Sequence, residues 1–283
     1  MNTLTAPRIV PRQGLFGPGR VLMWFSCGAA SAVGAKMAVE TYPDYDVEVL
    51  YCDTLKYEHP DNRRFFDDVS GWIGKPVKIV RSDKFKDIFD VFTRERYLNG
   101  PSGAPCTRAL KRNVRKAYQL PEDIHVFGYP SDEAIRIADF EADNKDVTCA
   151  WLLADHGITK RDCYRIVQEA GIKLPTMYLL GYKNNNCIGC VKGGSGYWNK
   201  IRDDFPEAYE RMAGMERTLG FALLKVNGKP CFLDDLPRGI GRYEAEPDIE
   251  CGPQCAAPSR IDSLPQLNSA AQVTAAERTV GNA

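Results

Sequence analysis

The first half of the chain alternates short apolar runs with longer stretches in which apolar residues recur every three or four positions. Four runs, at 21–25, 47–51, 77–80 and 124–127, are apolar or nearly so throughout. Runs of this length and composition are typical of strands buried on both faces of a parallel sheet. We therefore predict four parallel strands at these positions.

The stretches between these runs carry the helical pattern. We predict helices over 31–40, 60–73, 84–96 and 108–118, the second beginning with Pro60, which is favourable in the first turn of a helix. Strands that alternate with helices imply right-handed crossovers. The predicted fold class is therefore α/β and Rossmann-like, a parallel twisted sheet with helices on both faces.

The pattern changes in the second half of the chain. A helix is predicted over 159–170, with Thr159 as its N-cap and Gly171 ending it, and another over 206–219. Between them, 182–198 is a loop rich in Asn, Gly and Cys. The expected organisation is an extended lead-in at 1–20, an α/β domain at 21–150, a smaller Cys-bearing part at 151–255 packed on it, and a disordered tail at 256–283.

The charge balance and the apolar content argue against several classes of protein. The 37 Lys and Arg residues equal the 37 Asp and Glu residues, so no global basic field favours nucleic acid, although a local patch stays open. The apolar runs are far shorter than the ~20 residues of a membrane span. The first 20 residues lack the apolar core of a signal peptide. We expect a cytoplasmic protein without membrane association.

Ten cysteines are many for a chain of 283 residues. Without a secretory signal a reducing compartment is expected, so metal ligation, redox chemistry or plain buried thiols outrank disulfides. Cys52 in a strand, and Cys149 and Cys163 in expected helices, are interpreted as buried thiols. The cysteines in loops are the candidates for chemistry: Cys27, Cys106, Cys187, Cys190, Cys251 and Cys255.

The end of the first predicted strand is a candidate phosphate site, since ligands of open parallel sheets bind at the carboxyl ends of the strands. The segment there is Ser26-Cys27-Gly28-Ala29-Ala30-Ser31. Its small residues would let backbone N–H groups converge on an anion, and the following helix would add its positive dipole. Ser26 and Ser31 would supply hydroxyl donors. The alternative is a tight turn that happens to be small and polar.

A second signature lies at 184–194, Asn-Asn-Asn-Cys-Ile-Gly-Cys-Val-Lys-Gly-Gly. In a Cys-x-x-Cys turn both thiolates can point at one metal or cluster, and the glycines relieve crowding. Cys187 and Cys190 supply only half of a four-ligand site, and their spacing does not choose the metal.

Taken in order over most of the chain, these motifs resemble the phosphoadenylyl-sulfate (PAPS) reductase / PP-loop ATP pyrophosphatase superfamily. Ser26, Gly28 and Ser31 match its looser phosphate loop, Ser-x-Gly-x-x-Ser. Cys27 and Ala30 depart from the stricter form, Ser-Gly-Gly-x-Asp-Ser, so the carboxylate that would help hold Mg²⁺ near the phosphates is missing. The resemblance implies an adenine nucleotide, either ATP or PAPS/APS, at the strand ends.

The segments that follow two further predicted strands resemble motifs of the superfamily. Asp53 begins an Asp-Thr pair ahead of a Glu-x-Pro helix entry; it would bind a ribose hydroxyl, the base or a metal, or else act as a cap. Gly128, Glu133 and Arg136 match a Gly-x-x-x-x-Glu-x-x-Arg stretch, in which Arg136 would meet a phosphate or sulfate bidentately. The alternative there is a surface Arg–Glu pair. The Leu-Pro-x-Met-Tyr segment at 174–178 also stands in the family's order.

The resemblance also bears on the cysteines. Cys106, at the entry to a basic helix, resembles the Cys-rich entry in cluster-bearing members; with Cys187 and Cys190 it would make a three-thiolate [4Fe–4S] site with one open iron. Zinc, a redox-active dithiol and structural cysteines are the alternatives. The helix is interpreted as a solvated face, or else as a docking surface for a phosphate-rich substrate. Its cations are Arg108, Lys111, Arg112, Arg115 and Lys116.

The segment Glu250-Cys251-Gly252 resembles the Glu-Cys-Gly-x-His of PAPS reductases, whose Cys attacks the sulfuryl group, but Gln254 stands where the His would be. As a nucleophile Cys251 would need a lowered pKa, with Arg238, Arg242 or Lys192 as helpers. The alternatives are a flexible Cys pair or a fourth cluster ligand from Cys251 or Cys255.

The resemblance implies an enzyme of sulfur metabolism. The first interpretation is an ATP pyrophosphatase-type sulfurtransferase that adenylylates an acceptor, such as nucleic acid in DNA phosphorothioation or tRNA thiolation, before sulfur from a cysteine desulfurase or other donor displaces AMP. The second is a PAPS or APS reductase that uses Cys251 and a thioredoxin-like reductant. The third is a non-catalytic nucleotide-binding subunit of a larger assembly. Mg²⁺ would accompany ATP, and a homodimer is one expected state.

Overall fold

The computed structural model describes residues 19–101, 103–249 and 251–253. Among them, five parallel strands form one sheet in the order β3-β2-β1-β4-β5. The predicted α/β fold with a parallel sheet is confirmed. The strands are β1 (Arg20–Phe25), β2 (Asp46–Cys52), β3 (Val77–Val80), β4 (Ile124–Phe127) and β5 (Thr148–Ala150).

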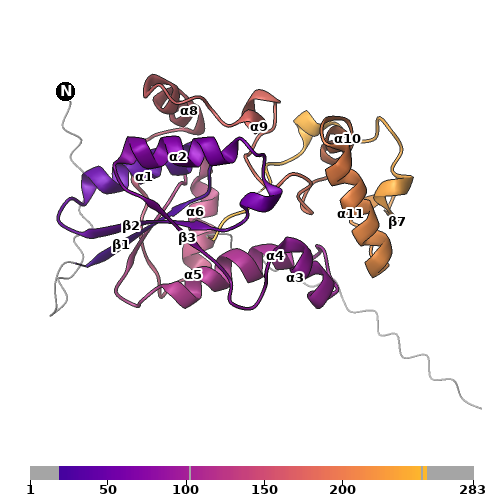
Figure 1. Cartoon of the computed structure of the whole chain (residues 1–283), viewed down its shortest axis with the longest axis horizontal. Coiled ribbons are helices and arrows are strands. Elements are labelled where there is room, and N and C mark those ends of the chain that lie inside the picture. Colours follow the sequence, from indigo (N-terminus) through magenta and orange to yellow (C-terminus); the bar gives the residue numbers. More distant parts are fainter. Residues whose placement is uncertain (1–18, 102, 250, 254–283) are drawn as a thin grey trace, which may run out of the picture.

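Helices cover both faces of this sheet (Figure 1). The helices along the sheet are α1 (Ala29–Thr41), α2 (Asn62–Ile73), α3 (Ile88–Glu95), α4 (Pro105–Thr107), α5 (Asn113–Tyr118), α6 (Ala134–Asp143), α7 (Leu152–Asp155) and α8 (Lys160–Glu169). Short 3₁₀ turns are η1 (Leu55–Tyr57) and η3 (Ser131–Glu133), and η2 (Arg108–Arg112) is a π-helical turn between α4 and α5.

Strand β1 shows why the sheet must be covered on both sides. Val21, Met23 and Phe25 pack into one core with α1, α2 and α8, whereas Leu22 and Trp24 pack into another with α5 and α6. Successive side chains of a strand point to opposite faces. A continuous apolar run therefore requires helices on both faces, as the sequence predicts.

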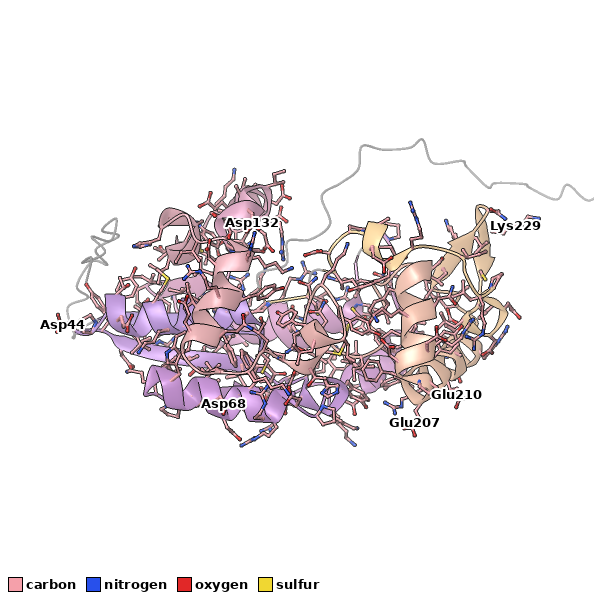
Figure 2. The ribbon with its side chains drawn as sticks, turned by 90° about the horizontal axis from the view of Figure 1, so that it is seen from above. Asp44, Asp68, Asp132, Glu207, Glu210 and Lys229 are labelled. Carbon is pink, nitrogen blue, oxygen red and sulfur yellow. The ribbon has the colours of Figure 1, made fainter. Side chains whose placement is uncertain are left out.

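A second group of elements forms a lobe with its own core beside the sheet (Figure 1). Figure 2 shows Lys229 at the outer end of this lobe and Asp44 at the opposite end of the molecule. Residues of α3 also contribute to this core. The elements of the lobe are α9 (Thr176–Leu179), α10 (Ser195–Asp204), α11 (Pro206–Leu219), β6 (Leu224–Val226), β7 (Lys229–Cys231), η4 (Leu233–Asp235) and η5 (Tyr243–Ala245).

Most predicted elements lie where the pattern placed them, with local corrections. Thr159 caps α8 through a capping box with Asp162, and Gly171 follows with a left-handed φ of 75°. Cys149 lies in β5 and not in the expected helix. The three residues of this strand pair with β4, and Cys149 lies opposite His125. The loop predicted over 182–198 is helical from Ser195 onward. The lead-in up to residue 18 and the tail at 256–283 lie outside the described residues.

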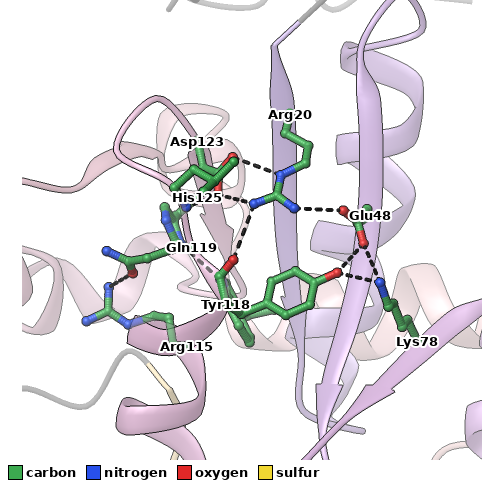
Figure 3. A network of polar contacts seen from close by, with 10 residues as sticks. Arg20, Glu48, Lys78, Arg115, Tyr118, Gln119, Asp123 and His125 are labelled. Carbon is green, nitrogen blue, oxygen red and sulfur yellow. Dashed lines mark hydrogen bonds and ion pairs between the residues drawn. The ribbon is translucent and has the colours of Figure 1, made fainter.

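Arg20 is the first residue of β1 and links neighbouring segments at the amino-terminal end of the strands (Figure 3). Its guanidinium bonds Asp123 at 2.6 Å and Glu48 at 3.3 Å. Glu48 in turn accepts hydrogen bonds from Tyr118 and Lys78. Among the described residues, no helix has the length and apolar character needed to cross a membrane.

Candidate nucleotide and thiol site

A polar cavity opens at the carboxyl ends of β1 and β4. This is the edge at which parallel α/β sheets bind ligands. The segments that meet there come from the first strand end, the fourth strand end, α8, α9, the Cys loop and the end of the described chain. The lining residues are Ser26, Gly28, Ala30, Ser31, Gly128, Glu133, Arg136, Lys160, Tyr164, Tyr178, Asn184, Asn185, Asn186, Ile249 and Cys251.

The loop between β1 and α1 leaves the start of the helix open. Gly28 is the N-cap of α1 and has no side-chain cap, and the first turn carries no acidic residue. Cys27 is fully buried with φ of 57°, a left-handed conformation that is unusual outside glycine. Asn185 stabilises this turn, because its side-chain amide donates to the Cys27 carbonyl at 2.7 Å. The first N–H groups and the positive end of α1 therefore face the cavity.

The fourth strand end must be glycine for the loop to reach this position. A Cβ at Gly128 would lie 2.6 Å from the backbone N and Cα of Ser31 and 3.0 Å from the carbonyl carbon of Ala30. Backbone atoms cannot move aside as a side chain can. The absence of a side chain at Gly128 therefore lets β4 approach the first turn of α1.

The predicted polar residues around the loop divide into two groups. Glu133 and Arg136 form an ion pair in the cavity wall, and the guanidinium lies 4.8 Å from the centre of the Tyr129 ring. Asp53 lies outside the cavity lining, and its carboxylate is paired with Arg81 at 2.7 Å. The structure thus brings Arg136 into the same cavity as the loop at 26–31 and leaves Asp53 outside it.

Cysteines from three distant segments gather beside the cavity. Cys187 and Cys190 are buried, and Cys106 and Cys251 are half-buried. The Cys251 sulfur lies 3.6 Å from the hydroxyl of Thr107, the residue after Cys106. Burial raises the pKa of Cys190 to about 12, and the nearby negative charge of a Cys251 thiolate adds to this. Burial and the Cys251 charge likewise raise the pKa of Cys106.

Cys251 differs from these thiols in the direction of its pKa shift. Burial alone would raise the pKa of Cys251, but Lys111 and Lys192 outweigh burial and lower it below its ordinary value. The Lys111 ammonium is itself buried and donates to the Cys251 carbonyl at 3.2 Å. Lys192 was a predicted helper of this thiol, and Lys111 was not.

The π-helical turn η2 explains why Lys111 was missed. The cations of the basic helix were interpreted as a solvated face, yet Lys111 and Arg115 are buried. The solvated-face interpretation is wrong for these two side chains. The extra residue of a π turn shifts the side chains that follow it relative to an α-helix. The available signal was the spacing of Cys106 and Lys111, which are five residues apart and so lie little more than one helical turn from each other.

A strap made of residues 243–249 carries Cys251 across the cavity. The Glu246 carboxylate accepts hydrogen bonds from the backbone N–H groups of Gly194, Gly196 and Tyr197 at 3.2, 2.6 and 3.2 Å, at the start of α10. The Asn186 amide donates to the Ile249 carbonyl at 2.8 Å. These bonds to the lobe and the Cys loop therefore fix the direction in which the strap approaches the loop at 26–31.

Further ties hold the same strap to α8 and the Cys loop. Lys160 donates to Asp248 at 2.6 Å and to Asn184 at 3.0 Å. The Tyr243 hydroxyl accepts from the Lys183 N–H at 2.7 Å. Glu250, Gln254 and Cys255, which belong to the predicted Glu-Cys-Gly motif and its flank, lie outside the described residues.

Comparison with known proteins identifies no family. No family model matches the chain, and no curated protein matches it. Among solved structures, the U34-tRNA thiolase NcsA from Methanococcus maripaludis with its [4Fe-4S] cluster is similar at a TM-score of 0.41 and 17% identity, over 78% of each chain. This likeness is too distant to assign a reaction to the present chain.

Proposed function

We propose that the chain is an adenine-nucleotide-dependent sulfur-transfer enzyme of the PP-loop / PAPS reductase type. The observation that carries the proposal is that Cys251 lines the same cavity as the open N-terminus of α1. One wall suits the phosphates of a nucleotide, and the other presents a thiol. An enzyme that moves sulfur to or from an adenylylated group needs both within one cavity.

In the first form of the reaction, an acceptor oxygen attacks the α-phosphorus of ATP and pyrophosphate leaves. A sulfur held as a persulfide on Cys251, supplied by an external sulfur donor, then attacks the activated carbon; a C–S bond forms, and the C–O bond breaks to release AMP. A second thiol then attacks the Cys251 sulfur of the resulting disulfide, so the thiolated acceptor leaves and Cys251 is left in a new disulfide. An external dithiol reductant reduces that disulfide and is itself oxidised. Nucleic acid is the proposed acceptor, as in tRNA thiolation.

The contribution of the chain's own residues follows from their positions. The first turn of α1 and Arg136 would bind and orient the phosphates. The Lys111 cation would favour the thiolate form of Cys251 beside them, because it lowers the pKa of this thiol. The strap would keep this thiol at the cavity wall and not in solvent.

A metal cluster on Cys106, Cys187 and Cys190 is a separate proposal. Thiolates are the ligands that iron–sulfur clusters and zinc prefer, and these three cysteines lie near one another. Among the described residues, however, no group of three or more His, Cys, Asp or Glu side chains is arranged to hold a metal ion. An iron–sulfur cluster here would supply an open iron for sulfur, and no step above depends on it.

A second candidate is reduction of PAPS or APS, which the position of Cys251 and the missing loop carboxylate at Ala30 favour. The Cys251 thiolate would attack the sulfuryl sulfur; an S–S bond forms, the S–O bond breaks, and the adenosine phosphate leaves. A thioredoxin-like dithiol would then release sulfite and be oxidised to its disulfide.

Nucleotide turnover separates the two candidates. Anaerobically purified protein is assayed for pyrophosphate release from ATP with Mg²⁺ and an RNA acceptor, and for sulfite release from PAPS with thioredoxin; iron, sulfide and zinc are measured on the same sample. Cys251→Ala should abolish the sulfur step in either reaction while nucleotide binding is kept. Cys231→Ala, a half-buried thiol outside the cavity, is the matched control.

The outcomes are distinct. Pyrophosphate release alone supports the transferase, and sulfite release alone supports the reductase. Tight nucleotide binding with neither product would contradict both and support a non-catalytic nucleotide-binding subunit. Full turnover by Cys251→Ala would remove the thiol from either reaction.

A further inference from the structure

The two serines of the loop use their hydroxyl groups on each other. The Ser31 oxygen accepts from the Ser26 N–H at 3.0 Å and from the Ser26 hydroxyl at 3.1 Å, and its proton goes to the Gly28 carbonyl at 2.9 Å. A hydroxyl has one proton and two lone pairs, so Ser31 is saturated. The donors that the sequence placed on these serines are therefore engaged inside the loop, where they hold its shape.

A third hydroxyl stands over the same loop. A Cβ at Gly28 would lie 3.1 Å from the Tyr178 hydroxyl, 3.6 Å from the Ser26 hydroxyl and 4.0 Å from the Ser31 hydroxyl. All three oxygens therefore surround the space above Gly28, directly at the start of α1. This space is open because residue 28 has no side chain.

The contacts of Tyr178 leave its proton available. The nearby backbone N–H groups of Ala29 and Asn185 act to lower the pKa of the phenol. Burial raises the pKa of Tyr178 despite these donors, so the hydroxyl stays protonated at neutral pH. A protonated phenol can donate a hydrogen bond, and within the described part of the chain no acceptor takes the Tyr178 proton.

The surroundings of Tyr178 keep this donor in place. Its ring packs against Tyr164, with the two ring centres 5.0 Å apart, and both rings line the cavity. Asn185 also lines the cavity and is buried, and its side-chain oxygen has no hydrogen-bond partner among the described residues. Two polar groups thus converge on this wall with unused hydrogen-bonding capacity, which indicates a ligand site.

We propose that Tyr178 is the hydroxyl donor to the phosphate or sulfuryl group that binds at the N-terminus of α1. The inference deepens the proposed function and rests on it. The role that the loop serines were expected to play belongs to a residue far along the chain, which α9 brings over Gly28. Because the donor is neutral and the loop carries no carboxylate, the loop itself holds the anion by hydrogen bonds and the helix dipole, beside the Arg136 cation in the cavity wall.

The test compares charged and uncharged ligands by isothermal titration calorimetry in EDTA. ATP, PAPS and adenosine are titrated into wild type, Tyr178→Phe and Tyr45→Phe. Loss of a hydrogen bond to a charged group should weaken whichever anionic nucleotide binds by about 10- to 100-fold in Tyr178→Phe, with adenosine unchanged. Tyr45, at the opposite end of α1, is the matched control and should match wild type in all three titrations.

Different results would contradict the proposed function and the role of Tyr178. Wild type that binds no adenine nucleotide, with or without Mg²⁺, would overturn the proposed function. Wild type that binds ATP or PAPS, with the same preference over adenosine in Tyr178→Phe, would overturn the role of Tyr178 alone. Gly28→Ala provides a second variant should Tyr178→Phe unfold, because its methyl group would lie 3.1 Å from the phenol oxygen. It should weaken the anionic nucleotide and not adenosine; equal weakening of both would count against the inference.

Discussion

The side-chain amide of Asn185 donates a 2.7 Å hydrogen bond to the backbone carbonyl of Cys27, 158 positions earlier in the chain. The same nitrogen donates to the Asn62 side chain at 2.9 Å. The first bond joins the Cys loop to the loop at 26–31 at Cys27, which has a left-handed φ, and the second joins the Cys loop to the start of α2. A side chain of the Cys loop therefore helps to fix the turn that precedes α1.

Replacing Asn185 should remove both of these contacts at once. Asn185→Ala removes two buried hydrogen bonds and leaves the Cys27 carbonyl and the Asn62 side chain without this donor, which should lower the free energy of unfolding by about 2–3 kcal/mol. Urea unfolding followed by tryptophan fluorescence measures this change. Asn184→Ala, which loses only the half-buried contact with Lys160, should cost less than about 1 kcal/mol. Equal losses in the two variants would show that the tie to Cys27 has no special weight.

Gly128 and Gly71 should respond to alanine in opposite directions. The methyl group of Gly128→Ala would meet backbone atoms of Ser31 at 2.6 Å, so about 2 kcal/mol or more of stability should be lost, together with nucleotide binding. Gly71→Ala adds a methyl group to an exposed position of α2 with nothing within 4 Å, and should stabilise by about 0.5–1 kcal/mol. Thermal unfolding of both variants checks the pair. A Gly128→Ala protein as stable as wild type would mean that β4 and α1 can separate freely.

The fold was predictable because its signals are local. Buried parallel strands must be continuously apolar and their connecting helices amphipathic, and both patterns are visible around Val21 and Phe65. Strand β5 was missed, because three residues with an exposed Thr148 carry no such pattern. Its pairing with β4 depends on tertiary contact, which no window of sequence contains.

The site was predictable in its parts and not in its contacts. The sequence named the small-residue loop and Cys251, and the structure brings both to one cavity. It did not reveal Lys111, because a π turn decides which way that side chain faces. The sequence placed Tyr178 in a segment that matches the superfamily, at 174–178, but assigned it no role. Its position over Gly28 is a tertiary contact, which the local sequence does not encode.

Glu246 should control the access of reagents to Cys251. Its carboxylate accepts three backbone N–H groups at the start of α10, so Glu246→Ala should cost about 1–2 kcal/mol of local stability and let the strap open more often. The rate of Cys251 alkylation by iodoacetamide, measured by peptide mass spectrometry, should rise about 5- to 30-fold. Glu244→Ala removes an exposed side chain of the same strap and should leave the rate unchanged. A rate unaffected by Glu246→Ala would mean that the other ties of the strap suffice.

His125 should make the protein sensitive to acid. Burial lowers its pKa to about 4, and the positive charge of Arg115 adds to this. Its Nδ1 accepts a 3.0 Å hydrogen bond from the Trp24 indole, which requires the neutral ring (Figure 3 shows His125 beside the Arg20 and Asp123 network). The unfolded chain has an ordinary His pKa of about 6.5 and so binds a proton at higher pH than the folded protein does. Stability from this group is therefore complete above pH 6.5 and is lost as the pH falls toward 4.

The loss should reach about 3 kcal/mol between pH 7 and pH 4, since each pKa unit is worth about 1.4 kcal/mol. His125→Asn removes the titrating ring while its side-chain oxygen can still accept from Trp24, so the variant should be less stable at pH 7 but show a flatter decline toward pH 4. Urea unfolding at half-unit pH steps measures both slopes. His156→Asn is the matched control, because within the described residues that half-buried ring bonds the Leu152 carbonyl alone, and the variant should leave the slope as in wild type. If His125→Asn declines as steeply as wild type, the acid sensitivity belongs to the carboxylates that are paired in the folded protein and not to the buried imidazole.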